Sequence, residues 1–250
     1  MFLLYSSQIL FQNVKVIPFM ASISLLIVTF FLTKAITGKR IAGLVSMIII
    51  LQSYTYLLYD TVAVYENFWV LFYILSLYTI LKKWYLSPIA YILSIFSKAF
   101  TFTFLPMNLY FLYRSSLESK TKYLTALLYG IVIGVTLSIW LFRESIYSTV
   151  INIDLSEFMI GMTSLSYQLR FDYLIIFGIL PLTICLIIKY IQGMKTTDSV
   201  LFLILGSLIA GPFVVMLSDF YYMLPYRFLP LIVFFAVGSG MLLYKKSNSQ

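Results

Sequence analysis

Long apolar runs, separated by short polar segments, dominate the pattern of this chain. A helix needs about 20 apolar residues to cross about 30 Å of hydrocarbon. Because lipid offers no partner for open backbone groups, and the runs are too long for barrel strands, we expect membrane-spanning helices. The predicted spans are Val14–Thr33, Ile41–Tyr59, Val64–Leu81, Tyr123–Phe142, Asp172–Ile191, Ser199–Leu217 and Phe228–Tyr244.

A further apolar stretch, Leu86–Tyr113, differs from these seven runs. As one helix of 28 residues it would be about 42 Å long, at about 1.5 Å per residue. Lys83 precedes it and Arg114 follows it, so it enters and leaves on the same side if both basic residues face the cytoplasm. We therefore expect two short or broken helices that turn near Lys98. The fold prediction is an all-α polytopic membrane protein of about nine helical segments, in a single transmembrane domain over residues 1–250.

The charged residues divide unevenly between the two sides of this topology. One side carries twelve basic residues and two acids, and the other carries five basic residues and seven acids. The basic side faces the cytoplasm by the positive-inside rule, which places the amino terminus outside and the carboxyl terminus inside. The formal charge of +8 therefore reflects topology and gives no support to nucleic-acid binding.

Composition excludes several classes of protein. Apolar residues make up 62% of the chain and charged residues 10%, with a mean hydropathy of +0.98, whereas soluble domains carry about 25% charged residues. A water-soluble globule, a disordered chain and a coiled coil are excluded. The single cysteine, Cys185, and the lack of histidine exclude a disulfide framework and the usual zinc, copper and haem ligands. We expect a multi-pass protein of a microbial cell membrane.

The polar and glycine-containing segments give weaker signals. The longest polar segment, 143–171, is predicted to lie outside, with a partly helical element in the interface. Gly130 and Gly134 form a GxxxG pattern that is typical of close helix packing. Gly238–Gly240 is too short to indicate a dinucleotide site, and the chain contains no P-loop, HExxH or CxxC motif.

Four charged residues near the predicted outer surface are candidates for chemistry. Asp60 and Glu66 are acids on one outer turn, where a carboxylate serves as a general base, a divalent-cation ligand or a solvated loop acid. Lys98 lies at the predicted hairpin tip, and Arg227 begins the last span. A charge at that depth indicates a functional site, with snorkelling or a simple ion pair as the alternative.

Tyrosines also gather near the predicted outer interface. Tyr221 and Tyr222, with Asp219 close by, are candidates to line a substrate. An aromatic belt explains most of these tyrosines, and a sugar-stacking or lipid-lining surface is the alternative.

An ordered series of short motifs resembles the GT-C class of membrane glycosyltransferases, in particular its protein mannosyltransferases and lipid A aminoarabinose transferases. Lys39–Gly43 resembles a basic, glycine-containing turn, and Glu66–Tyr78 resembles a helix opened by an acid. Leu93–Phe100, followed by Phe104-Leu105-Pro106, looks like the hairpin motif of this class, and Pro225–Pro230 is similar to its terminal signature.

The resemblance implies transfer of a sugar from a polyprenyl-phosphate donor to an acceptor outside the cytoplasm. It implies that Glu66 lies near the catalytic cavity, that Lys98 faces the donor phosphate and that Arg227 is the signature arginine. Fixed cations suit this role because the departing phosphate develops negative charge. Asp60 and Glu66 alone are a thin ligand set, so no metal site is predicted, although a divalent cation is compatible with them.

The chain also departs from the class. Members carry an external acidic loop after the first span, and this sequence begins after that point, so we expect either an upstream segment or a shortened homologue. In a shortened homologue Asp60 or Glu66 would have to replace the principal base. The alternatives are a non-catalytic subunit or scaffold of a larger membrane complex and, ranked last, a transporter built around the broken hairpin.

Overall fold

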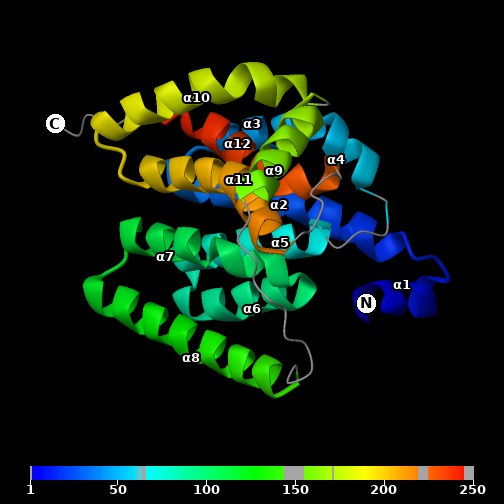
Figure 1. Cartoon of the computed structure of the whole chain (residues 1–250). Coiled ribbons are helices and arrows are strands. Elements are labelled where there is room, and N and C mark those ends of the chain that lie inside the picture. The colour runs from blue at the N-terminus through cyan, green and yellow to red at the C-terminus, as the bar shows by residue number, and fades with distance from the viewer. Residues whose placement is uncertain are drawn as a thin grey trace.

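The computed structural model describes residues 2–60, 62, 66–143, 155–170, 172–218 and 225–244, and all regular structure within these ranges is helical. The prediction of an all-α chain is confirmed for them (Figure 1). The α-helices are α1 (Phe2–Phe11), α2 (Val16–Thr37), α3 (Arg40–Leu51), α4 (Tyr54–Tyr59), α5 (Glu66–Lys82), α6 (Ser87–Ser97), α7 (Leu105–Arg114), α8 (Ser119–Arg143), α9 (Leu155–Leu169), α10 (Tyr173–Ile191), α11 (Thr196–Ser218) and α12 (Leu229–Met241). Three 3₁₀ helices join them: η1 (Trp84–Leu86), η2 (Ala99–Phe104) and η3 (Pro225–Phe228).

Three of the described helices are long and apolar enough to cross a membrane, which is consistent with membrane association. They are α2, α10 and the Thr196–Phe213 part of α11. The other predicted spans correspond to helices that are shorter or less apolar, such as α3 and α12. Seven full spans are therefore not established by the described helices.

The predicted span Ile41–Tyr59 is wrong as a single helix. The chain breaks after Leu51, and Ser53 has an extended backbone between α3 and α4. The Ser53 hydroxyl accepts a hydrogen bond from the Tyr56 backbone N–H at 3.1 Å, so it caps a new helix. The hydrophobicity of residues 41–59 alone predicts one continuous helix, and the Ser53 cap shows that a second helix begins there.

The predicted break near Lys98 is present. Helix α6 ends at Ser97, Lys98 is extended (φ −159°, ψ 118°), and the chain returns through η2 and α7. Two buried tyrosines, Tyr91 of α6 itself and Tyr73 of the neighbouring α5, donate hydrogen bonds to carbonyls of the returning segment. The Tyr91 hydroxyl donates to the Thr101 carbonyl at 2.9 Å, and the Tyr73 hydroxyl donates to the Phe104 carbonyl at 3.3 Å. Irregular backbone is tolerated in an apolar core when it is satisfied in this way.

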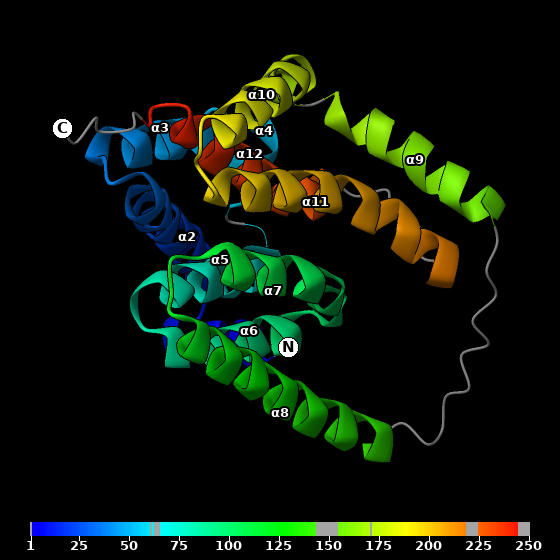
Figure 2. The ribbon, with the colours of Figure 1, turned by 90° about the vertical axis from the view of Figure 1, so that its left-hand side faces the viewer.

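Helix α12 forms the centre of the core. It packs against α2, α3, α10 and α11, and Figures 1 and 2 show it between these helices. Gly240 permits a close approach to α3, because a Cβ at this position would lie 2.6 Å from the Ala42 carbonyl oxygen. The Gly238–Gly240 fragment therefore serves helix packing.

Helix α8 lies at the edge of the bundle (Figure 1). It packs against α6, α7 and η1, while Tyr123, Leu127 and Ile131 are exposed. A Cβ added at Gly130 or Gly134 would meet nothing within 4 Å. The expectation that this GxxxG pattern packs closely is therefore wrong within this chain.

The predicted external segment 143–171 is described only in part. Residues 144–154 lie outside the described residues, and α9 covers most of the remainder. Helix α9 packs against α11, where a Cβ at Gly161 would lie 2.7 Å from the Cα of Pro212. The partly helical character is present, and placement in the membrane interface stays a prediction.

One end of the bundle gathers chain segments that the charge pattern assigned to the cytoplasm; we call it the basic end. The ammonium groups of Lys39 and Lys189 donate to the carbonyls of Leu243 and Tyr244, each at 2.8 Å. These bonds join the α2–α3 turn and the end of α10 to the residues that follow α12. In Figure 1 this end lies at the left, with the carboxyl terminus.

Candidate functional site

At the opposite end of the bundle, a buried acid begins helix α5. Glu66 is 3% exposed, and its carboxylate forms an ion pair with the ammonium group of Lys98. A carboxylate in the first turn of a helix is also favoured by the helix dipole. The neighbouring Asn67 side chain donates to the carbonyls of Tyr59 and Asp60, at 3.2 and 3.3 Å, and so holds the end of α4 against the start of α5.

The break between α6 and η2 positions Lys98. The hairpin tip is held against α5 because the Ser94 hydroxyl donates to the Trp69 carbonyl at 2.7 Å. The buried Trp69 ring packs against Phe100 and Phe104, with ring centroids 5.9 and 5.4 Å apart. The Lys98 side chain remains 25% exposed, so it is the accessible member of the ion pair.

Arg227 brings a second cation to the same place. It lies in η3, which packs against α4, α9 and α12. The positive charge of Arg227 lies close enough to Lys98 to act on it electrostatically. The site therefore combines the Glu66–Lys98 ion pair with a second cation nearby.

Asp60 lies at this end of the bundle in different surroundings. It is half-buried after the last turn of α4, and the Ser22 hydroxyl donates to its backbone carbonyl at 3.4 Å. The Tyr56 hydroxyl donates to the Ser22 carbonyl at 2.9 Å. The end of α4 is thus bound to Ser22 of α2, whereas the Glu66 side chain is paired with Lys98.

The remaining predicted site residues, Asp219, Tyr221 and Tyr222, lie outside the described residues. Over the part of the chain that the structure describes, no three His, Cys, Asp or Glu residues are grouped as metal ligands. Glu66, Lys98 and Arg227 are therefore the predicted residues that the structure brings together.

A buried polar cluster between α5, α6, α7 and α8 was not anticipated from the sequence. The Tyr129 hydroxyl lies 2.6 Å from the Ser87 hydroxyl and donates to the Asn108 side-chain oxygen at 3.0 Å. The Asn108 amide donates to the Ser76 hydroxyl at 2.7 Å. All four side chains are at most 1% exposed, so the cluster is closed and its role is to hold the helices together. The only indication of this cluster in the sequence was the presence of isolated Ser, Asn and Tyr residues within apolar segments.

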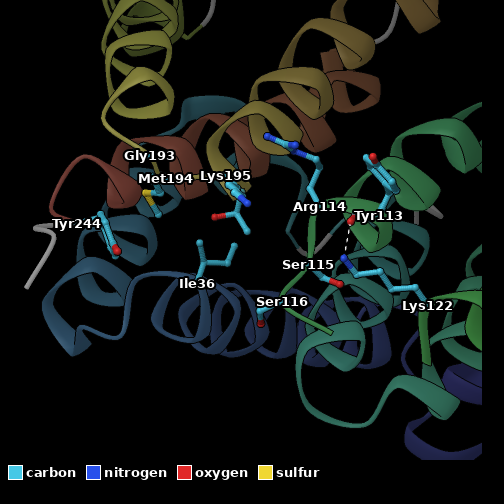
Figure 3. Close-up of a pocket in the computed structure, with 11 residues that line it drawn as sticks. Ile36, Tyr113, Arg114, Ser115, Ser116, Lys122, Gly193, Met194, Lys195 and Tyr244 are labelled. Atoms are coloured by element: carbon cyan, nitrogen blue, oxygen red, sulfur yellow. Dashed lines mark hydrogen bonds between the residues drawn. The ribbon is translucent and has the colours of Figure 1, made fainter. Parts of the chain in front are cut away.

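A cavity at the basic end was also missed. It has a volume of about 540 Å³ and is lined by the α7–α8 and α10–α11 turns, the end of α2 and Tyr244 (Figure 3). Arg114, Lys122 and Lys195 are among its lining residues. The sequence pattern used these cations only as indicators of topology, since nothing in it predicts that their turns meet around one cavity.

Comparison with known proteins adds no assignment. No family model matches this chain, and neither the curated proteins nor the solved structures include a match. The resemblance to GT-C glycosyltransferases therefore stays a prediction that depends on the motifs and on the arrangement of the charged residues.

Proposed function

We propose that this chain is a GT-C-like integral membrane glycosyltransferase. In this proposal it transfers a sugar from a polyprenyl-phosphate donor to an acceptor at the outer face of a cell membrane. Seven spans and the broken hairpin, with the amino terminus outside, are the membrane arrangement that the proposal uses. The observation that carries it is the ion pair of the buried Glu66 carboxylate with Lys98, with the positive charge of Arg227 acting on Lys98.

The three side chains suit the two halves of a glycosyl transfer. The bond between the anomeric carbon of the sugar and the donor phosphate oxygen breaks, and a bond from that carbon to the acceptor oxygen or nitrogen forms. Lys98 and Arg227 stabilise the negative charge on the departing lipid phosphate. Glu66 takes the proton that the acceptor loses.

The ion pair between Glu66 and Lys98 means that the donor must bind before Glu66 can act as a base. A carboxylate held by an ammonium group is a weak base, because its charge is already stabilised. A donor phosphate beside Lys98 and Arg227 competes for the ammonium group and releases the carboxylate. Glu66 therefore becomes an effective base only when the donor is bound, which limits transfer to the loaded enzyme.

Substitution of the two cations tests the proposal. We expect Lys98→Ala and Arg227→Ala to abolish glycan transfer from a polyprenyl-phosphate sugar in membrane vesicles, with normal membrane insertion. Lys98→Arg should retain part of the activity because it keeps the charge. Lys15→Ala is the matched control, since Lys15 is an exposed lysine before α2. Normal transfer by both alanine variants would refute the site assignment.

A non-catalytic subunit or scaffold is the second candidate. The closed Glu66–Lys98 pair favours it, because a satisfied buried ion pair also serves a purely structural role. Two results together would favour a subunit or scaffold over a glycosyltransferase. The chain would co-purify with stoichiometric membrane partners, and it would turn over no lipid-linked sugar.

A further inference from the structure

The cavity at the basic end has the size and position of a binding site. Its volume of about 540 Å³ falls within the range of about 300–1,000 Å³ that is typical of small-molecule sites. It lies between turns of the chain, and Figure 3 shows the labelled side chains of Arg114, Lys122 and Lys195 around this space. It lies at the opposite end of the bundle from Glu66 and is independent of the glycosyl-transfer proposal.

The charge of the cavity is positive. Arg114, Lys122 and Lys195 come from three different segments: the end of α7, the start of α8 and the α10–α11 turn. Of the described residues that line the cavity, none is acidic. Asp198 pairs with the Arg114 guanidinium at 2.6 Å and accepts a hydrogen bond from Tyr110 at 2.9 Å, so its charge balances Arg114. Glu118, in the α7–α8 turn, is exposed and does not line the cavity, and the lining therefore keeps the positive charges of the two lysines.

Donor groups for an oxyanion are also present. The Lys122 ammonium group donates to the Tyr113 carbonyl at 2.7 Å, which uses one of its three N–H groups. Ser116 and Thr196 add hydroxyl groups to the lining. The start of α11 does not add to this set, because Asp198 already places a negative charge in its first turn. The cations and hydroxyls of the lining together match a phosphate group.

The rim of the cavity indicates where the ligand comes from. Tyr113 is 68% exposed, and Tyr113 and Tyr244 both line the cavity. The guanidinium of Arg114 lies 5.5 Å from the ring centre of Tyr190. Tyrosines of this kind are enriched at the depth of lipid headgroups, and basic pockets between membrane helices bind anionic headgroups.

We propose that this cavity binds a phosphate group, carried by an anionic lipid headgroup or present as free phosphate. The lipid source is favoured by the tyrosine rim. A headgroup bound here would contact both the α7–α8 turn and the α10–α11 turn.

The test uses the purified full chain in detergent. Phosphatidylglycerol or phosphatidylcholine is added, and native mass spectrometry measures how much of each lipid is retained. Inorganic phosphate is titrated separately by calorimetry and as a competitor for the retained lipid. Preferential retention of phosphatidylglycerol supports a headgroup site, whereas saturable binding of phosphate without lipid preference supports a free-phosphate site. Equal retention of both lipids with no binding of phosphate would overturn the proposal.

Charge variants separate the cavity from general surface electrostatics. Lys122→Gln and Lys195→Gln should each weaken binding about fivefold, the contribution expected of one lysine near an anionic group. Lys195→Arg keeps the positive charge in an exposed turn, so it should bind as well as the unsubstituted protein. Lys120→Gln is the matched control, because Lys120 is exposed on the same helix and does not line the cavity. An equal loss of binding in Lys120→Gln would overturn the proposal.

Discussion

The Glu66–Lys98 pair makes a quantitative prediction about stability. Glu66 is 3% exposed and Lys98 is 25% exposed, so loss of either partner has unequal consequences. Lys98→Met leaves a buried carboxylate without its ammonium group, which costs about 3–5 kcal/mol for a fully buried pair. We expect about 3 kcal/mol here, at the lower end of this range, because the partly exposed Lys98 side chain shows that water reaches one side of the pair.

Removal of the acid should cost less. Glu66→Gln leaves a lysine that already reaches solvent, and we expect a loss of about 1.5 kcal/mol. The double variant leaves neither charge unpaired and should also lose about 1.5 kcal/mol, although the two single losses sum to about 4.5 kcal/mol. The predicted coupling energy is therefore about 3 kcal/mol.

A double-mutant cycle on the detergent-solubilised full chain measures this coupling. The free energy of unfolding is obtained from denaturant titration followed by circular dichroism, with Lys15→Met as a control for loss of an exposed lysine. Additive losses, within about 0.5 kcal/mol, would show that the two side chains do not interact. The site described around Glu66 would then be refuted, whatever the activity of the protein.

Three further predictions concern packing, the polar cluster and membrane sidedness. Gly240→Ala should lower the melting temperature, with a loss of about 1–3 kcal/mol of stability from overpacking. Gly134→Ala adds a methyl group in open space, so it should leave stability unchanged or raise it by about 1 kcal/mol. Equal effects of the two substitutions would contradict the described packing of α12. Tyr129→Phe should lower the free energy of unfolding by about 1 kcal/mol, because two buried groups lose a hydrogen bond; an unchanged unfolding transition would count against the cluster. In a cysteine-free background, Lys83→Cys and Lys120→Cys should react with an impermeant thiol reagent from the same side of the membrane, and labelling from opposite sides would reject the hairpin topology.

The break at Lys98 was predicted from the sequence. Basic residues on both sides of Leu86–Tyr113 indicated a turn, and Lys98 was the charged residue near its middle. Because a charge in an apolar stretch is expensive unless paired, an ion pair with Asp60, Glu66 or Asp219 was one of the alternatives for Lys98. The choice among these acids depends on which helices are neighbours, and the structure pairs Lys98 with Glu66.

Other features depended on contacts that no periodicity reveals. The break at Ser53 arises from one side-chain cap within an apolar run. Gly134 and Gly240 occur in similar small-residue patterns, yet only Gly240 meets a neighbouring helix. The choice between them depends on which helices are neighbours, and that is decided by the whole fold. The cavity near Lys195 was missed for the same reason, since its lining comes from segments far apart in the sequence.

The central position of α12 has a consequence for biogenesis. Translation proceeds from the amino terminus, so α2, α3, α10 and α11 are made before the helix against which they pack. Until the ribosome has delivered α12, the apolar surfaces of these helices that it will cover remain exposed. Packing of this core must therefore wait for synthesis of α12, and a nascent chain stopped before Leu229 should expose these surfaces to chaperones and proteases.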